Sequence, residues 1–215
     1  MDVVLEHLGD YATGLRTTLA LSLVSFALAL LLGFAVATMR VSPVAPLRAA
    51  GLAYVETFRN IPLTAFFALA VFGLPKVGIG FSTFFRFAVL VLGTYTGAFV
   101  AEAVRSGINT VAAGQAEAAR SLGLTFGQTL WNVVLPQALR SVVQPIGSLF
   151  IALAKNSAIA SAFAVVELTS TFDQLTEREA ATLPLLVGTA LAYLSITVPA
   201  GLLTGAVERR VAFKR

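Results

Sequence analysis

Side chains that could carry out chemistry are few in this sequence. The 215 residues include no cysteine and one histidine, His7, which stands in the polar start of the chain. Without cysteine the chain forms no disulfide and offers no thiolate nucleophile or sulfur ligand. The patterns H-E-x-x-H, G-x-S-x-G and G-x-x-x-x-G-K-S/T are absent as well, so we expect no metal site, no catalytic residue and no bound nucleotide. The sequence predicts a protein that is not an enzyme and needs no cofactor.

The remaining chemistry is that of charged side chains within apolar sequence. Glu102 and Arg105 stand three residues apart, the spacing at which two side chains pair on one face of a helix. Glu56 and Arg59 repeat this spacing. We interpret all four as residues near the end of a helix, at the boundary between apolar and polar surroundings. For Glu102 and Arg105 we predict an ion pair on the helix surface.

Lys155, followed by Asn156 and Ser157, stands within a longer apolar stretch, fifteen residues after Arg140. In a helix this separation is about 22 Å. It would place the lysine deep in a bilayer, where a charge costs roughly 2.5 to 3.5 kcal/mol. One interpretation is that these three side chains line a translocation pathway, in which a cation would suit an acidic amino acid. The other is that Lys155 extends toward the interface or pairs with a backbone carbonyl.

The composition explains the apolar surroundings of these charges. Hydrophobic residues make up 57% of the chain and charged residues 12%, about half of the roughly 25% that soluble domains carry. The mean hydropathy is +0.85. These values predict an integral protein of the lipid bilayer with no large soluble domain. We interpret the formal charge of +4 as a set of topology signals, and no nucleic acid is expected to bind.

The apolar stretches predict an all-α fold with about five transmembrane helices in one domain, 1–215. A span needs about 20 apolar residues, and only 17–39 and 180–207 exceed this length without a charge. The first of these has acidic residues before it and is 23 residues long, so we expect a membrane span there and not a cleaved signal peptide. Pro62 is expected to kink the second span. The predicted spans are 17–39, 49–75, 84–104, 141–166 and 180–207, and a long polar loop covers 105–140.

Basic residues at the ends of the spans predict the orientation. Five spans place the two termini on opposite sides, and cytoplasmic flanks carry an excess of lysine and arginine. Nine basic residues fall on one side and four on the other. We therefore expect the N-terminus outside and both the long loop and the C-terminus in the cytoplasm. The nine are Arg40, Arg48, Arg105, Arg120, Arg140, Arg209, Arg210, Lys214 and Arg215, and the four are Arg16, Lys76, Arg86 and Arg178.

The long loop has the pattern of two short helices joined by a tight turn. Residues 115–122 can form two helical turns, and Gly123 is placed to end that helix. Thr125, with Gln128 three residues later, has the pattern of a capping box, which starts a second and amphipathic helix. Pro136 is expected to end this second helix.

The first loop helix presents small side chains. Ala118, Ala119 and Leu122 are expected to share one face, and Glu117 and Arg120 can pair on the other. Such a helix could dock as a small knob on a cytoplasmic partner. It could equally rest in the lipid interface, as amphipathic helices do. Physical chemistry alone favours neither of these two interpretations over the other.

The loop also carries a distinctive spacing of residue types. A Glu-Ala-Ala triplet is followed after three residues by a glycine, and after nine more by Val-x-Leu-Pro. This spacing resembles the loop shared by permease subunits of ABC importers, with valine in place of the more usual isoleucine. The resemblance implies that the loop is a coupling helix, which docks into a cleft of an ATPase. The matching residues are Glu117, Ala118, Ala119, Gly123, Val133, Leu135 and Pro136.

Other stretches extend the resemblance over nearly the whole chain. FRNIPLTAFF at 58–67, FVAEAVRSGINTV at 99–111 and ALAKNSAIAS at 152–161 resemble permeases that import polar amino acids. MRVSP at 39–43 together with GQAEAARSLGL at 114–124 resembles the glutamate uptake permeases of actinobacteria most.

The resemblance implies a set of partners and a location. It implies a multi-pass subunit of the bacterial cell membrane that forms the pathway for an amino acid substrate, L-glutamate. It also implies assembly with a second permease subunit, identical or homologous, with a dimer of cytoplasmic ABC ATPases and with an extracytoplasmic substrate-binding protein. ATP would be hydrolysed on the partner subunits.

A self-sufficient secondary transporter or channel is the alternative from another class. It would use Glu102, Arg105 and Lys155 as an ion relay. Uptake into vesicles that carry this chain alone and an ion gradient would distinguish the two, since a permease subunit transports nothing without its ATPase. An intramembrane enzyme is disfavoured because a nucleophile and metal ligands are missing from the sequence.

Overall fold

The protein is helical throughout the part of the chain that the structure describes. This structure is a computed structural model and describes residues 2–211, among which no strand occurs. A bent pair of helices, Ala45–Asn60 with Leu63–Val77, can serve as one membrane span. The predicted all-α fold with about five spans is therefore confirmed. Among the described residues, the four single helices that are long and apolar enough to cross a membrane are Leu8–Val41, Phe84–Asn109, Phe126–Phe163 and Thr182–Arg210.

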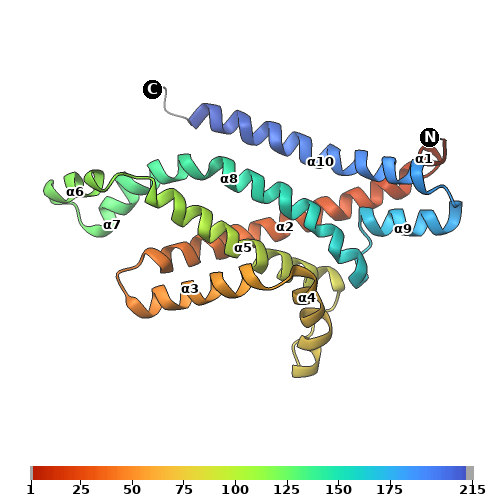
Figure 1. The fold of residues 1–215 in the computed structure, drawn as a ribbon, viewed down its shortest axis with the longest axis horizontal. Helices are drawn as coiled ribbons and strands as arrows, with labels where there is room; N and C mark the ends of the chain where they lie inside the picture. The colour runs from red at the N-terminus through yellow and green to blue at the C-terminus, as the bar shows by residue number, and fades with distance from the viewer. Residues whose placement is uncertain (1, 212–215) are drawn as a thin grey trace.

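The long helices lie lengthwise beside one another (Figure 1). Helix α2 (Leu8–Val41) packs along α5 (Phe84–Asn109), α5 packs on α8 (Leu135–Asn156), and α8 packs on α10 (Thr182–Val211). Short helices lie at the two ends of this bundle. They are α6 (Ala113–Ser121) and α7 (Phe126–Thr129) at one end, and α1 (Asp2–Glu6) and α9 (Leu168–Glu179) at the other.

Helix α5 occupies the centre because small residues let both neighbours approach it closely. A Cβ atom added to Gly33 of α2 would lie only 3.0 Å from the carbonyl oxygen of Gly97 on α5. A Cβ atom added to Gly107, farther along α5, would lie 2.2 Å from Cγ1 of Val142 on α8. Small residues allow this kind of backbone contact between membrane helices. The three helices therefore form one packed unit.

The second predicted span is bent sharply at Pro62. Helix α3 ends at Asn60 and α4 (Leu63–Ala68) begins after Pro62, with 105° between the two directions. From α4 the chain continues through η1 (Leu69–Gly73) and η2 (Leu74–Val77). Proline disfavours helical backbone at the residue before it, so the helix ends there and restarts in a new direction. The kink expected at Pro62 is confirmed.

The fourth long helix begins much earlier than the loop pattern predicts. Helix α7 continues through a π turn, η3 (Leu130–Val134), into α8, and a 3₁₀ segment, η4 (Ser157–Phe163), completes it. Pro136 is the second residue of α8, so the expectation that it ends the helix was wrong. The π turn changes the hydrogen-bond register just before the proline, where the missing N–H and the ring would disturb a regular helix. The side-chain amide of Gln137 donates to the carbonyl of Val133 at 2.9 Å.

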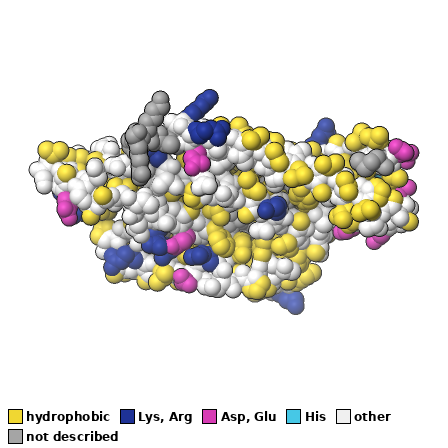
Figure 2. Space-filling model, turned by 45° about the horizontal axis from the view of Figure 1, so that its top comes forward, with side chains coloured by type: hydrophobic (Ala, Val, Ile, Leu, Met, Phe, Trp, Pro, Cys, Tyr) yellow, Lys and Arg dark blue, Asp and Glu magenta, His cyan; other side chains and the backbone are white. Residues whose placement is uncertain are grey.

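The surface of the bundle is apolar along its middle. Yellow side chains cover much of the central face in Figure 2, and acidic side chains gather at the right-hand end, where α1 and α9 lie. Large apolar side chains such as Leu31, Leu183 and Leu202 are each more than two-thirds exposed, at 72%, 71% and 68%. Apolar surface of this extent belongs in contact with lipid or with another membrane subunit.

Candidate functional site

The loop between α5 and α8 folds as a helix, a tight turn and a second helix, as predicted. Helix α6 ends where Leu122 N–H donates to the Ala118 carbonyl at 3.2 Å. Gly123 follows with a φ of +84°, a conformation that residues with a Cβ rarely adopt. Gly123 N–H donates to the Arg120 carbonyl at 2.9 Å, and Leu124 N–H to the Ala119 carbonyl at 3.2 Å. The left-handed glycine therefore reverses the chain in a single turn.

The second helix of the loop starts with the predicted capping box. Gln128 N–H donates to the Thr125 hydroxyl at 3.3 Å, and Thr125 N–H donates to the Gln128 side-chain oxygen at 2.9 Å. These two bonds satisfy backbone donors that the first turn of a helix leaves open. Because α7 is continuous with α8, the capping box also fixes where the long fourth helix starts.

The surface of α6 differs in part from the prediction. Ala119 is buried, but Ala118 is exposed and Leu122 is 81% exposed, so these three residues do not form one packed face. Glu117 is exposed and forms no ion pair with Arg120 among residues 2–211. The exposed side of α6, with Glu117 and Ala118, lies at the end of the bundle (Figure 1).

At the other end of the loop motif, Leu135 and Pro136 lie in the first turn of α8. Leu135 is half-buried and Pro136 is exposed. The residues that carry the permease resemblance are therefore split between a projecting helix and the start of a long one. Their arrangement allows the loop to dock on a partner while it remains joined to the bundle.

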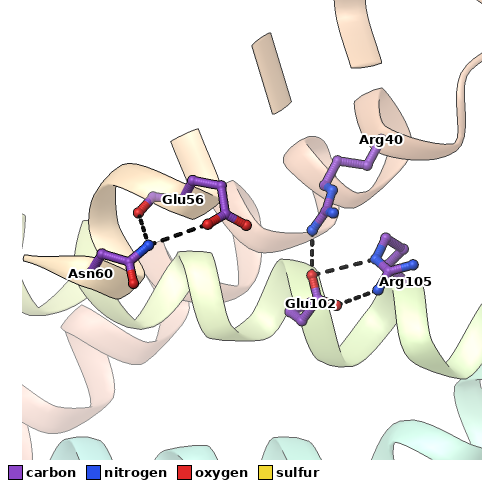
Figure 3. A network of polar contacts seen from close by, with 5 residues as sticks. All are labelled: Arg40, Glu56, Asn60, Glu102 and Arg105. Atoms are coloured by element: carbon purple, nitrogen blue, oxygen red, sulfur yellow. Dashed lines mark hydrogen bonds and ion pairs between the residues drawn. The ribbon is translucent and has the colours of Figure 1, made fainter. Parts of the chain in front are cut away.

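Glu102 lies at the centre of a charge network at this same end of α5. Arg105, one turn farther along α5, donates to Glu102, which confirms the predicted ion pair. Arg40, in the last turn of α2, also donates to Glu102 (Figure 3). The sequence patterns indicate Arg40 only as a flanking charge, because its partner Glu102 lies 62 positions away in the sequence. The network joins the ends of α2 and α5.

Glu56 and Arg59 find separate partners. The Asn60 side-chain amide donates to the Glu56 carboxylate at 3.2 Å and to the Glu56 carbonyl at 2.7 Å (Figure 3). The Arg59 guanidinium lies 5.6 Å from the centre of the Phe99 ring, within the range of a cation–π contact. Both residues are exposed near the end of α3.

Lys155, Asn156 and Ser157 lie at the far end of α8 from the loop. Lys155 is exposed, Asn156 is half-buried, and Ser157 is buried with its hydroxyl donating to the Ala154 carbonyl at 2.8 Å. Glu102 lies toward the opposite end of the bundle, so the charges that an ion relay would need are not brought together (Figures 1 and 3). Among the described residues, no ion pair or hydrogen bond joins Lys155 to Glu102 or Arg105.

Glu167 is a buried carboxylate that sequence analysis did not single out. It precedes α9 and accepts hydrogen bonds from Thr169 N–H at 2.8 Å and Ser170 N–H at 3.1 Å. The Tyr193 hydroxyl of α10 donates to it at 2.7 Å and the Thr18 hydroxyl of α2 at 3.4 Å. Burial raises the pKa of Glu167 although these bonds oppose the shift. One carboxylate thus ties α9 to α2 and α10.

His7 forms a second link at this end of the molecule. One ring nitrogen, Nδ1, lies 3.0 Å from the Asp10 carboxylate, and the other, Nε2, lies 3.2 Å from Glu179 at the end of α9. The hydrogen bond to Asp10 is the main cause that raises the pKa of His7, and Glu179 adds to it. The link connects the start of α2 with the turn between α9 and α10.

Known proteins are similar to this chain in sequence and in fold. The chain is 42% identical over 210 residues to the glutamate transport system permease protein GluC of Corynebacterium glutamicum, with 92% of each chain covered. It is 36% identical over 211 residues to the probable glutamine ABC transporter permease protein GlnM of Bacillus subtilis, with 98% of this chain and 97% of the relative covered. These similarities extend over almost the entire length of each relative.

Solved structures and a protein family lead to the same conclusion. The crystal structure of an amino acid ABC transporter with histidines contains a chain that superimposes with a TM-score of 0.89 at 30% identity, with 96% of each chain covered. Residues 12–213 match the family described as binding-protein-dependent transport system inner membrane component. The chain is a multi-pass membrane protein and belongs to this family, as an amino acid ABC importer permease.

Proposed function

We propose that this chain forms part of the pathway of an importer for L-glutamate and couples it to ATP hydrolysis on partner subunits. The loop geometry carries the proposal. Its first helix, α6, is exposed at the end of the bundle, and its second helix runs without a break into the fourth long helix. A partner that moves α6 and α7 can therefore displace α8 directly. In this role Glu117, Ala118, Ala119, Gly123, Leu135 and Pro136 form or support the coupling helix.

The proposed orientation places the loop in the cytoplasm and the N-terminus outside. The count of nine basic flanking residues against four supports it. Two of the nine, Lys214 and Arg215, lie outside the described residues. The acidic end of the bundle, with α1 and α9, would then face a binding protein outside the cell (Figure 2). ATPase subunits would meet the opposite end.

The proposed substrate is an acidic amino acid. Relatives named for glutamate and for glutamine are both similar to this chain. The exposed cation of Lys155, next to the half-buried amide of Asn156, supports glutamate, because a second carboxylate would gain a charged partner there. The Glu102 network, in contrast, is satisfied within the chain and has a role in holding α2 to α5.

The proposed assembly contains partners of three kinds. They are a second permease subunit, identical or homologous, a cytoplasmic ABC ATPase dimer, and an extracytoplasmic substrate-binding protein. The exposed apolar surface of α10, which includes Leu194 and Leu202, supports burial against lipid or a second permease. The pattern G-x-x-x-x-G-K-S/T is missing from the sequence, which supports ATP hydrolysis on partner subunits.

Reconstitution of the complete transporter tests the proposal. Proteoliposomes that contain this chain with its ATPase and permease partners should accumulate labelled L-glutamate only when ATP is inside and the binding protein is outside. Unlabelled L-glutamate in excess should block this uptake, and L-glutamine should compete less well. Stronger competition by glutamine would change the substrate assignment. Uptake by this chain alone in an ion gradient would contradict the ATP-coupled function.

A further inference from the structure

A pocket lies behind the coupling helices, at the end of the bundle where the Glu102 network is found. Its volume is about 420 Å³, and it lies between the ends of α2 and α5 on one side and the loop helices on the other. Arginines from three separate segments line it: Arg40 of α2, Arg105 of α5 and Arg120 of α6. The loop and the bundle thus contribute cationic groups to the same cavity.

The charges of this pocket do not cancel. Glu102 accepts from both Arg40 and Arg105, and among the residues from 2 to 211 no ion pair involves Arg120. The pocket lining therefore carries three guanidinium groups, and Glu102, which is not part of the lining, pairs with two of them. Each guanidinium has five N–H donors, so the two that pair with Glu102 retain donors for another anion. Arginine is well suited to bidentate binding of phosphate.

Thr129 supplies an independent sign that the pocket takes a polar ligand. Thr129 is 4% exposed and lines the pocket, and its hydroxyl has no hydrogen-bond partner in the described part of the chain. A buried hydroxyl without a partner is unfavourable. A ligand atom in the pocket that accepts or donates a hydrogen bond would satisfy it.

An apolar groove lies next to the pocket. It has a volume of about 380 Å³ and is lined by side chains of α2, α5 and the start of the fourth long helix. Ile108 and Leu130 line both the groove and the pocket. Trp131 lines the groove and is 71% exposed, as is typical of tryptophan at a membrane interface. The remaining lining includes Phe34, Val104 and Leu139.

We propose that pocket and groove together bind one anionic phospholipid, with its phosphate among the three arginines and an acyl chain along the groove. A cationic cavity next to an apolar groove matches a molecule with an anionic head and a hydrocarbon tail. Basic pockets between membrane helices on the cytoplasmic side bind anionic headgroups in this way. Only the assignment to the cytoplasmic leaflet depends on the proposed orientation. The bound lipid would connect Arg120 of the coupling helix to the ends of α2 and α5.

Fluorescence of Trp131, the only tryptophan in the chain, offers a direct test. The full-length permease is placed in nanodiscs of phosphatidylcholine that contain increasing amounts of acyl-brominated phosphatidylglycerol, since bromine quenches nearby tryptophan. Brominated phosphatidylcholine serves as the zwitterionic reference. Half-maximal quenching is expected at a clearly lower mole fraction of phosphatidylglycerol than of phosphatidylcholine. Equal quenching by the two lipids would overturn the proposal.

Variants separate a specific site from general attraction to an anionic membrane. Arg120→Gln should raise the mole fraction of phosphatidylglycerol for half-maximal quenching about fivefold, the size expected for one basic group near an anionic surface. Thr129→Val should raise it as well. Arg209→Gln removes a charge from an exposed arginine in the last turn of α10, outside the pocket lining, and should leave it unchanged. If Arg120→Gln and Arg209→Gln behave alike, no specific headgroup site exists.

Other occupants of the pocket give distinct results in the same assay. Inorganic phosphate should not displace the brominated phosphatidylglycerol, because it has no tail for the groove. Displacement by phosphate would assign the pocket to a small soluble anion and would contradict the lipid. Addition of the ATPase should also leave quenching in place, and its loss would assign the arginines to an acidic group of that partner.

Discussion

At the scale of single residues, Glu102 and Glu167 illustrate two ways of keeping a carboxylate within a helical bundle. Glu102 is neutralised by two arginines, Arg40 and Arg105. Glu167 meets no cation among the described residues and relies on hydroxyl and backbone N–H donors. Breaking either set leaves a charge without partners in apolar surroundings, which is strongly unfavourable. Both carboxylates therefore have structural partners within the described residues, and the pathway role of Lys155 stays a prediction.

Replacement of Lys155 by methionine tests its place in the pathway. Lys155→Met keeps the length of the side chain and removes its charge, so a lysine that only reaches the interface should be replaced without loss. If the cation helps a carboxylate cross, glutamate uptake should fall at least about tenfold, because hydrogen bonds to charged groups contribute about 1.5 to 3 kcal/mol. Uptake into proteoliposomes, with copurification of partners as a measure of assembly, is the readout.

A second lysine provides the control for this experiment. Lys76 is also exposed but belongs to η2, outside the fourth long helix, so Lys76→Met should transport like the wild type. Equal and normal uptake by both variants would remove Lys155 from the pathway.

The sequence reveals local pairs better than distant ones. The three-residue spacing of Glu102 and Arg105 predicted their ion pair correctly, because helix geometry brings such positions together, whereas Glu117 and Arg120 at the same spacing form no ion pair among residues 2–211. Arg40 joins the pair through the packing of α2 on α5, which no local pattern encodes. Glu167 was missed for the same reason, since its donors Thr18 and Tyr193 come from two other helices. Its position directly before a helix was the one available signal.

At the scale of helices, Gly123 allows a test in which strain is separated from crowding. Its φ is +84°, and a Cβ atom added there would meet no atom within 4 Å. Gly123→Ala therefore imposes only backbone strain, about 1 to 2 kcal/mol, which should tilt α6 relative to α7. Stimulation of ATP hydrolysis by the loaded binding protein should fall about five- to tenfold. The measurement is the rate of ATP hydrolysis in proteoliposomes with and without the loaded binding protein.

Gly127 is the matched control for the coupling turn. It lies in α7, also has no atom within 4 Å of an added Cβ, and has no positive φ. In the Gly127→Ala variant the loaded binding protein should stimulate ATP hydrolysis as in the wild type, because alanine favours helices. Glu117→Lys, which reverses a charge on exposed α6, should weaken ATPase copurification. Normal coupling by both Gly123→Ala and Glu117→Lys would make the loop a passive interfacial segment.

His7 predicts a pH-dependent link between α2 and α9. Its raised pKa means that the folded protein binds the proton more tightly than the unfolded chain. The stabilisation is complete below the unfolded pKa of about 6.5 and is lost as the pH rises through the raised pKa. The thermal unfolding midpoint should therefore decrease as the pH rises above about 6.5 and through the raised pKa of His7, and His7→Gln should remove this part of the decrease. An identical pH profile for His7→Gln would show that the link does not affect stability.

Helix type and position followed from the sequence more readily than helix ends. Only 17–39 and 180–207 could be recognised by their charge-free length alone, and the other spans were predicted with a charge near one end. The prediction that Pro136 ends a helix was wrong because a π turn precedes the proline here and the helix continues through it. The capping box at Thr125 was predictable because it depends on neighbours in sequence.

At the scale of the whole molecule, the absence of cysteine allows the orientation to be tested without background labelling. Glu177 of α9 and Ser121 of α6 are both exposed and lie at opposite ends of the bundle. In intact cells, Glu177→Cys should react with an impermeant thiol reagent, whereas Ser121→Cys should react only after the membrane is opened. Glu177 is preferable to its neighbour Thr176, whose hydroxyl is buried. The reverse labelling pattern would invert the topology, and labelling of both would contradict five spans.

The fourth long helix packs closely against α10 near its middle. There Gly147 brings the backbone so close to α10 that an added Cβ would lie 2.2 Å from the Thr204 side chain. From this contact the helix extends roughly 30 Å to Phe126 and roughly 25 Å to Phe163. Rotation of this helix as one body about the contact would move its two ends in opposite directions, in proportion to its two arms. Lys155 lies eight residues beyond the contact, roughly 12 Å along the helix, so a displacement of the loop end would appear beside Lys155 reversed in sense and reduced to roughly two-fifths.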